Sequence, residues 1–86
     1  MSLNDRCFVY VIRSLKIHRT YVGHAENTSL RLRQHNSGKI DATKYASDWE
    51  LVHTEEFASR SLAFKRERFY KMGDGRRVLK LKGLSK

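Results

Sequence analysis

The chain has 86 residues and one cysteine, and its 18 Lys and Arg against 9 Asp and Glu give a formal net charge of +9. A lone cysteine excludes an internal disulfide, and the longest apolar run, residues 7–12, is far too short to cross a bilayer. We therefore expect one soluble, cytoplasmic domain over residues 1–86, with no membrane partner.

Two strands are predicted in the first quarter of the chain. Residues 6–14 are β-branched and aromatic and are apolar at both alternating positions, which predicts a strand covered on both faces and central in its sheet. Residues 15–19 form a polar connector without the usual Gly or Asn-Gly turn signal. Residues 20–23 predict a second short strand, close enough to the first to form a hairpin with it.

A helix, a loop and a third strand follow. Asn27 or Thr28 can cap a helix that runs to about Asn36 and stops at Ser37-Gly38, where the glycine supplies a left-handed residue. Residues 39–48 are polar and aperiodic, which indicates a loop. Residues 49–57 predict the third strand.

The last third of the chain predicts a second helix. Ser59 or Ser61 would cap it, and it would end at Gly73, before a Gly-Asp-Gly turn. Residues 76–81 form either a last short helix or an extended tail. The order β-β-α-β-α predicts an α+β domain, a three-stranded antiparallel sheet flanked by helices.

The sequence excludes several kinds of site. Four histidines and one distant cysteine do not show the spacing of a structural zinc site. The chain also has no Gly-rich phosphate loop, no Ser/His/Asp signature and no Cys-x-x-Cys pair. Phosphate-loop, serine-hydrolase and dithiol chemistries are therefore not expected.

Three groups of residues remain as candidates. Tyr10 and Tyr21 lie on neighbouring predicted strands, where pairing can bring their phenols together, although strand tyrosines commonly serve only in a core or an interface. Arg31 and His35 are spaced i, i+4 and so project from one helix face, which could also be a solvated face. Glu67 is the only acid between residues 59 and 73; surrounding cations should keep it ionised, and the alternative is a simple ion pair with the lysine four residues later.

In this order, these features resemble the GIY-YIG nuclease family, and within it the small stand-alone bacterial members related to the N-terminal nuclease domain of UvrC. Phe8-Val9-Tyr10 resembles the first half of the signature and Tyr21-Val22-Gly23 the second half. Residues 31–39 resemble the helix that carries an arginine four residues before a histidine or tyrosine. Residues 55–61, followed by Glu67, resemble the strand and helix that bear the metal-binding glutamate.

The resemblance covers about residues 8–71, with three departures from the family pattern. Phe8-Val9 replaces Gly-Ile, and His24 stands where some branches have a lysine. Several branches carry an asparagine after the helix of the glutamate, and this chain has none beyond Asn36.

The resemblance implies a metal-dependent endonuclease that hydrolyses phosphodiester bonds in nucleic acid, with DNA expected ahead of RNA and DNA repair as the setting. Glu67 would bind one divalent ion, with magnesium expected and manganese as the alternative. Arg31 would clamp a phosphate oxygen, and His35 would hydrogen-bond a tyrosine or the phosphate. One tyrosine would orient or deprotonate the attacking water, with its pKa lowered by nearby cations; which of the two does so stays open. The catalytic residues that the resemblance implies are Tyr10, Tyr21, Arg31, His35 and Glu67.

Positive charge is concentrated at the C-terminal end. Residues 1–58 hold 8 basic and 7 acidic residues, a net charge of +1, whereas residues 59–86 hold 10 and 2, a net charge of +8. Such clustering favours a polyanion, because neutralised phosphates release counterions, over a basic face that serves only solubility. The expected contacts to nucleic acid are Gly23, His24, Lys65, Arg66, Arg68, Lys71, Arg76 and Arg77, with Lys80 and Lys82 as further candidates.

Two other functions are compatible with the sequence. One is a nucleic-acid-binding module that keeps the fold without turnover, and the other is a small ribosome- or RNA-associated structural protein. The sequence shows no base-reading element, so we expect the domain to take its targeting from a protein partner, to recognise a structured substrate, or to be a poor nuclease alone.

Overall fold

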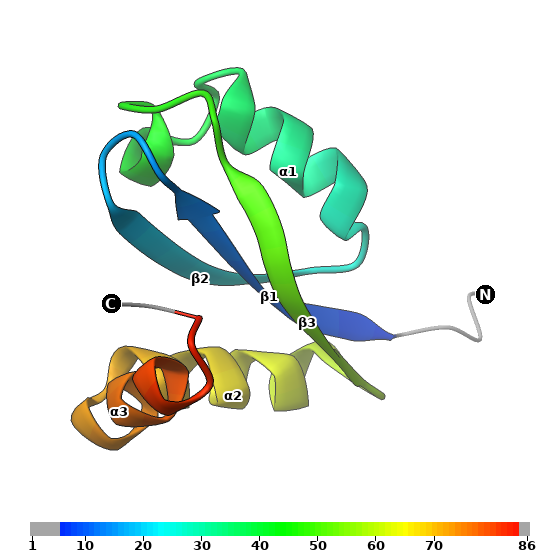
Figure 1. Ribbon diagram of the computed structural model, residues 1–86. Coiled ribbons are helices and arrows are strands. Elements are labelled where there is room, and N and C mark those ends of the chain that lie inside the picture. The colour runs from blue at the N-terminus through cyan, green and yellow to red at the C-terminus, as the bar shows by residue number, and fades with distance from the viewer. Residues whose placement is uncertain (1–5, 85–86) are drawn as a thin grey trace, which may run out of the picture.

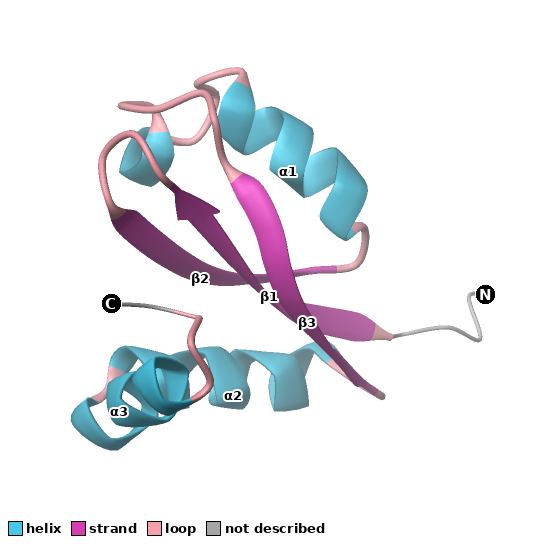
Figure 2. Cartoon of the chain, in the orientation of Figure 1, coloured by secondary structure: helices cyan, strands magenta, loops and turns pink. Residues whose placement is uncertain are grey.

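A three-stranded antiparallel sheet lies between helices on both of its faces in the computed structural model, which describes residues 6–84 (Figures 1 and 2). The elements are β1 (Cys7–Ser14), β2 (Arg19–Ala25), α1 (Thr28–Asn36), β3 (Glu50–Phe57), α2 (Arg60–Lys71) and α3 (Gly73–Leu81). Helix α1 covers one face of the sheet, and α2 and α3 cover the other (Figure 1). The predicted α+β class and its antiparallel sheet are confirmed.

The sheet order is β2-β1-β3, so the most apolar strand is central, as predicted. Strands β1 and β2 form the expected hairpin, in which Tyr10 lies opposite Gly23 and Ile12 lies opposite Tyr21. Because side chains alternate along a strand, β1 supplies both cores. Tyr10 and Ile12 pack with Trp49 in one cluster, and Cys7, Val9 and Val11 pack in the other, against α2 and α3.

Local signals set the starts of α1 and α2 and the end of α1. The side chain of Asn27 accepts a hydrogen bond from the backbone N–H of Leu30 at 3.0 Å, and that of Ser59 accepts one from Leu62 at 3.2 Å. These contacts settle the two predicted alternatives in favour of Asn27 and Ser59 as caps. Gly38 follows α1 with a φ of 77°, the left-handed conformation expected of it.

Two sequence-based expectations were wrong. Residues 41–43, predicted as loop, form a short 3-10 turn. Gly-Asp-Gly is not a connecting turn but the first turn of α3, which begins at Gly73 and buries Leu79 in the core. A Cβ on Gly75 would lie 1.8 Å from the carbonyl oxygen of Phe69, so this glycine serves the close approach of α2 and α3. No helix within residues 6–84 is long and apolar enough to span a membrane.

Candidate active site

A buried chain of hydrogen bonds joins β1, α1 and the loop after α1. Tyr10 Oη lies 2.8 Å from Nε2 of His35, and Nδ1 of His35 lies 2.6 Å from Oγ1 of Thr43. That hydroxyl lies 3.4 Å from the carbonyl oxygen of Ile40. Each donor has an acceptor when Tyr10 donates to His35, His35 to Thr43, and Thr43 to Ile40, which makes His35 the neutral tautomer protonated at Nδ1.

Burial keeps both rings of this chain neutral, since Tyr10 is 2 % exposed and His35 is 0 % exposed. Burial raises the pKa of Tyr10 to about 12, and the guanidinium of Arg31 acts in the opposite direction, first through hydrogen bonding and then through its charge. Burial, aided by Arg31, lowers the pKa of His35 to about 4. The expectation that nearby cations lower the pKa of a catalytic phenol is therefore wrong for Tyr10, where the loss of hydration dominates.

The second signature tyrosine lies on the same face of the sheet but is open to solvent. Tyr21 is two positions from the residue opposite Tyr10, so both rings face α1. The ring centroid of Tyr21 is 5.1 Å from that of His35, and the ring centroid of Tyr10 is 5.6 Å from it. Tyr21 is half-buried and lines surface hollows on both sides of β2. Of the two phenols, Tyr21 is the one that a water and a substrate can reach.

Gly23 makes room for the phenol of Tyr10. A Cβ at position 23 would lie 2.5 Å from Oη and 2.7 Å from Cζ of Tyr10, well inside van der Waals contact. The glycine of the second signature half is therefore required by the tyrosine of the first half. Contact of Gly23 with nucleic acid stays a prediction.

Arg31 carries an unsatisfied donor. Its Nη1 donates to Oε1 of Gln34 at 3.1 Å. Its Nε is buried and, within residues 6–84, has no hydrogen-bond partner. Buried donors are normally satisfied, and a guanidinium with a free N–H is suited to an anionic ligand.

Glu67 projects from α2 as a largely buried carboxylate, with its side chain 12 % exposed. Its Oε1 lies 2.5 Å from Nδ1 of His24, and its Oε2 lies 2.7 Å from Nζ of Lys71. Burial acts to raise the pKa of Glu67, but the hydrogen bonds from Lys71 and His24 outweigh it and hold the pKa below its usual value. Glu67 is therefore ionised, as predicted, and the ion pair considered as the alternative is also present.

Two side chains of the edge strand β2 contact α2 at this point: His24 pairs with Glu67, and the ring of Tyr21 lies beside Lys71. The charges of Arg31 and Glu67 act on the pKa of Tyr10 in opposite directions, since Arg31 lowers it and Glu67 raises it. The Nζ of Lys71 lies 5.2 Å from the ring centroid of Tyr21 and so connects the glutamate to this tyrosine. A groove of about 460 Å³ runs between β2 and the pair α2–α3 at this point. The basic residues that line it are Lys71, Arg76 and Lys80.

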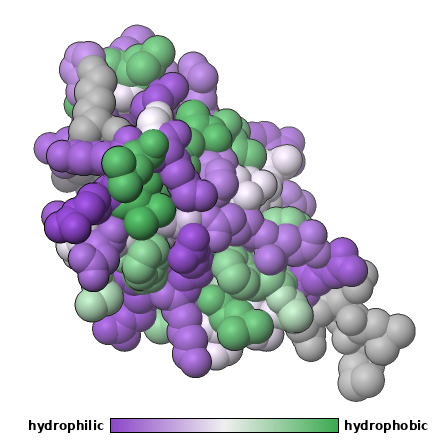
Figure 3. All heavy atoms as spheres, turned by 60° about the horizontal axis from the view of Figure 1, so that its bottom comes forward, coloured by the Kyte–Doolittle hydropathy of each residue, from purple (hydrophilic) through white to green (hydrophobic). Residues whose placement is uncertain are grey.

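The other predicted basic contacts lie elsewhere. Arg66 donates to Glu55 at 2.8 Å and to the Tyr70 hydroxyl at 3.0 Å, so it is held in an ion pair. Lys65 and Arg68 line a separate hollow with Phe64 and Met72 on the outer side of α2. Figure 3 shows this side of the molecule as mostly hydrophilic, with separate apolar patches. The remaining candidate of α3, Arg77, is exposed.

Sequence reasoning missed two residues that support the site. The hydroxyl of Thr43 is hydrogen-bonded to Nδ1 of His35, yet Thr43 lies in a segment whose polar, aperiodic sequence indicates only a loop. Asn36 fixes the backbone of Trp49, the residue before β3. Its Nδ2 donates to the carbonyl of Trp49 at 3.0 Å, and its Oδ1 accepts from the N–H of Trp49 at 2.7 Å. The one sequence signal that could have indicated a role for Asn36 is its position next to His35.

The donor set at Glu67 is compatible with a single divalent ion. Residues 6–84 contain no group of three or more His, Cys, Asp or Glu side chains arranged to hold a metal. An ion here would therefore bind one ionised carboxylate and take most other ligands from water and phosphate, a coordination that magnesium accepts. Nδ1 of His24 is a nitrogen that lies beside this carboxylate.

Comparisons with known proteins agree with this geometry. The GIY-YIG catalytic domain matches residues 6–77. A UPF0213 protein of Staphylococcus saprophyticus is 32 % identical over 78 residues, which cover 90 % of this chain and 94 % of that protein. A UPF0213 protein of Natronomonas pharaonis is 38 % identical over 61 residues, or 70 % and 71 % of the two chains, and one of Staphylococcus epidermidis is 36 % identical over 64 residues, or 73 % and 77 %. No solved structure matches the chain significantly.

The family match spans most of the chain and includes both signature strands, α1 and α2. It supports a nuclease-type function on nucleic acid, and nucleases of this family generally use divalent metals. On the strength of the matched domain, the relatives and the arrangement of the signature residues, the chain belongs to the GIY-YIG family.

Proposed function

We propose that this domain is a metal-dependent endonuclease that hydrolyses phosphodiester bonds, with DNA as its substrate ahead of RNA and DNA repair as its setting. The observation that carries the proposal is that Lys71, which pairs with Glu67 at 2.7 Å, lies 5.2 Å from the ring centroid of Tyr21, and that both Lys71 and Tyr21 line a basic groove beside β2. Arg31 adds a buried Nε that has no hydrogen-bond partner within residues 6–84. Phosphodiester hydrolysis needs an oriented water, positive charge for the phosphoryl oxygens, and help for the leaving oxygen. Tyr21, Arg31 and Glu67 are of the types that meet those needs.

Tyr21 is the residue proposed to orient the attacking water and, as its phenolate, to accept the proton that the water loses. Solvent reaches Tyr21, whereas Tyr10 is buried, donates to His35, and has a pKa raised to about 12. Tyr10 and His35 are therefore positioning residues that hold β1 and α1 together beneath Tyr21. As the water oxygen bonds to phosphorus, the bond from phosphorus to the 3′ oxygen breaks, and the released 3′ oxygen takes up a proton from solvent.

Arg31 is proposed to bind a non-bridging oxygen of the scissile phosphate. Its unpartnered Nε supports this role, because a phosphate oxygen would satisfy a buried donor that the fold leaves open. The planar guanidinium can present two parallel N–H groups, which a lysine cannot do.

Glu67 is proposed to hold the divalent ion, with magnesium expected and manganese as the alternative. When bound, the ion would stabilise negative charge on the phosphate and the leaving oxygen. The two oxygens of Glu67 are paired with His24 and Lys71, so both side chains would have to give up part of their contact with the carboxylate for the ion to bind. The side chain of Lys71 is 45 % exposed and has solvent to move into.

The same pairing favours a second candidate function, a nucleic-acid-binding module without turnover. A carboxylate whose two oxygens are both paired has its hydrogen-bonding and charge partners without a metal. Under this alternative, Lys71 and Arg76 would still attract a phosphate backbone through the groove, but Glu67 would serve only to position Lys71.

Cleavage by a Glu67→Gln variant tests the proposal. Wild-type protein and the variant would be incubated with labelled single-stranded, duplex, nicked and branched DNA and with structured RNA, each with magnesium, manganese or EDTA at low salt. We expect metal-dependent cleavage by the wild type and a loss on the order of 100-fold or more in the variant, because the amide is a poor ligand for the ion.

Glu56→Gln is the matched control, since Glu56 lies exposed on β3 in an ion pair with Arg6. This variant should cleave like the wild type. Equal binding and no cleavage by all three proteins would overturn the proposal in favour of the binding module.

A further inference from the structure

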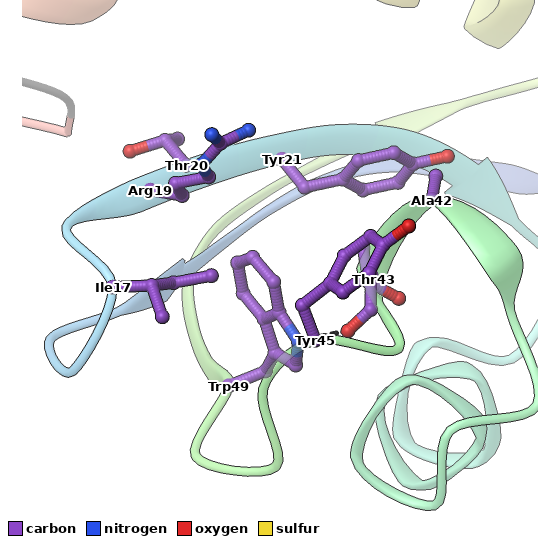
Figure 4. Close-up of a pocket in the computed structure, with 8 residues that line it drawn as sticks. All are labelled: Ile17, Arg19, Thr20, Tyr21, Ala42, Thr43, Tyr45 and Trp49. Atoms are coloured by element: carbon purple, nitrogen blue, oxygen red, sulfur yellow. Dashed lines mark hydrogen bonds between the residues drawn. The ribbon is translucent and has the colours of Figure 1, made fainter.

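A second hollow lies on the other side of β2, next to the candidate active site. It has a volume of about 530 Å³, within the range of small-ligand pockets. Figure 4 shows Trp49 and Tyr45 reaching toward β2 from the segment before β3, while Tyr21 projects from β2 itself. Ile17 and Arg19 lie toward the far end of the hollow, at the β1–β2 turn (Figure 4).

One aromatic residue of this hollow, Tyr45, is not required for folding. Tyr45 is 76 % exposed, so its ring contributes little to the core. Lys44, whose Nζ lies 5.9 Å from the ring centroid of Tyr45, adds positive charge at the rim. Exposed aromatic faces with flanking cations are what proteins use to stack unpaired nucleobases.

The hollow is held open by fixed contacts. Two hydrogen bonds with Asn36, one donated and one accepted by its side chain, hold the backbone of Trp49. The indole Nε1 donates to the carbonyl of Thr43 at 3.0 Å, which fixes the ring in its plane. Trp49 is only 4 % exposed, so its ring is fixed at the base of the hollow, whereas the ring of Tyr45 lies exposed at its side.

The hollow is also continuous with the candidate site. Tyr21 lines both this aromatic hollow and the basic groove on the α2–α3 side, and so does Thr20. Thr43 lines the aromatic hollow and holds His35 at 2.6 Å. A strand that crosses β2 at Tyr21 would thus have cations for its phosphates on one side and aromatic rings on the other.

We propose that this aromatic hollow binds one unpaired nucleobase next to the scissile phosphate, stacked against Tyr45 and over Trp49. The inference rests on the proposed function in that it takes nucleic acid as the substrate. It defines the substrate class as nucleic acid with an unstacked base at the cleavage position, as in single strands, flaps, bulges or junctions. A regular duplex, whose bases are stacked inside, lacks the group that fits this hollow.

Trp49 makes a direct test available, because it is the only tryptophan of the chain. Its fluorescence would be followed while single-stranded oligonucleotides are added to the Glu67→Gln variant in EDTA, where cleavage cannot contribute. The reference ligand is an oligonucleotide of equal length and charge with one central run of abasic sites, and a matched duplex is the third ligand. We expect quenching by the base-containing single strand, and weaker binding with little quenching by the other two.

Substitutions at Tyr45 locate the effect. Tyr45→Ala should weaken binding of the base-containing strand about 10-fold, the size of one lost stacking contact. Tyr45→Phe should stay within about 2-fold of the parent, because the ring remains. Phe64→Ala is the matched control, since Phe64 is an exposed aromatic residue on α2 that lies outside this hollow.

The outcomes separate this inference from the nuclease proposal. Equal affinity and equal quenching for base-containing and abasic strands, or no effect of Tyr45→Ala, would overturn the nucleobase pocket whatever the cleavage assays find. Base-dependent quenching by a protein that never cleaves would overturn the nuclease proposal alone and leave a single-strand-binding domain.

Discussion

The buried imidazole of His35 makes the stability of the fold depend on pH. An unfolded histidine titrates near its ordinary pKa of 6.5, whereas in the folded state the pKa is lowered to about 4. Between these values the unfolded chain binds a proton that the folded chain does not, so stability is complete above about pH 6.5 and falls as the pH falls toward 4. Going from pH 7 to pH 5 should cost about 2 kcal/mol at this residue.

Denaturant unfolding at pH 7 and pH 5, followed by circular dichroism, measures this loss. His35→Gln should lower the stability at pH 7 yet lose about 2 kcal/mol less than the wild type on going to pH 5. His18→Asn provides the control, because His18 is exposed and its φ of 54° suits asparagine. An unchanged pH dependence in His35→Gln would show that His35 is not the titrating group.

A single hydroxyl accounts for the start of α2, and with it for the placement of Glu67. Ser59→Ala removes the side-chain acceptor for the N–H of Leu62 and should lower the free energy of unfolding by about 1 kcal/mol. Ser61→Ala, within the first turn, should change it by no more than about 0.5 kcal/mol. Equilibrium unfolding in urea at pH 7 compares the two, and an equal loss in both would contradict the assignment of the cap.

The elements that the sequence predicted well are those whose signals are local. The apolar run of β1 indicated a central strand because no other position in the sheet buries both faces. Asn27 and Gly38 marked the ends of α1, because the side chain of Asn27 accepts a hydrogen bond from the N–H of Leu30 and Gly38 adopts the left-handed conformation. Each of these signals acts within a few residues.

The start of α3 could not be predicted in this way. Two glycines in three residues normally indicate a turn, but Gly75 is present because the backbone of Phe69 passes too close for a side chain. That contact exists only after α2 and α3 have packed. The pairing of His35 with Thr43, and of Asn36 with Trp49, likewise depends on how the loop folds back, which no periodicity encodes.

At the scale of the whole molecule, positive charge lies on two separate sides of α2 and α3. Arg76 and Lys80 line the groove beside β2, while Lys65 and Arg68 line the hollow on the outer side of α2. If the groove carries the phosphates, the double variant Arg76→Gln/Lys80→Gln should reduce the slope of log affinity against log salt for duplex DNA by about 1.8. This figure assumes one phosphate contact for each residue.

The double variant Lys65→Gln/Arg68→Gln removes the same charge from the other side and should reduce the slope by less than about 0.5. Fluorescence anisotropy over a salt series, with Glu67→Gln as the parent protein, gives both slopes. Equal reductions would mean that nucleic acid responds to the overall field of the C-terminal third rather than to the groove.

The contact between Tyr10 and Gly23 has an evolutionary consequence. The phenol fills the space that a side chain at position 23 would need, so the two halves of the signature behave as one steric unit. If a smaller residue replaces Tyr10 first, position 23 has room to accept a side chain. If Gly23 is replaced first, the protein must pass through an overpacked intermediate. Loss of the signature in descendants of such a domain would therefore have a preferred order, tyrosine before glycine, and the two positions would covary although they lie on different strands.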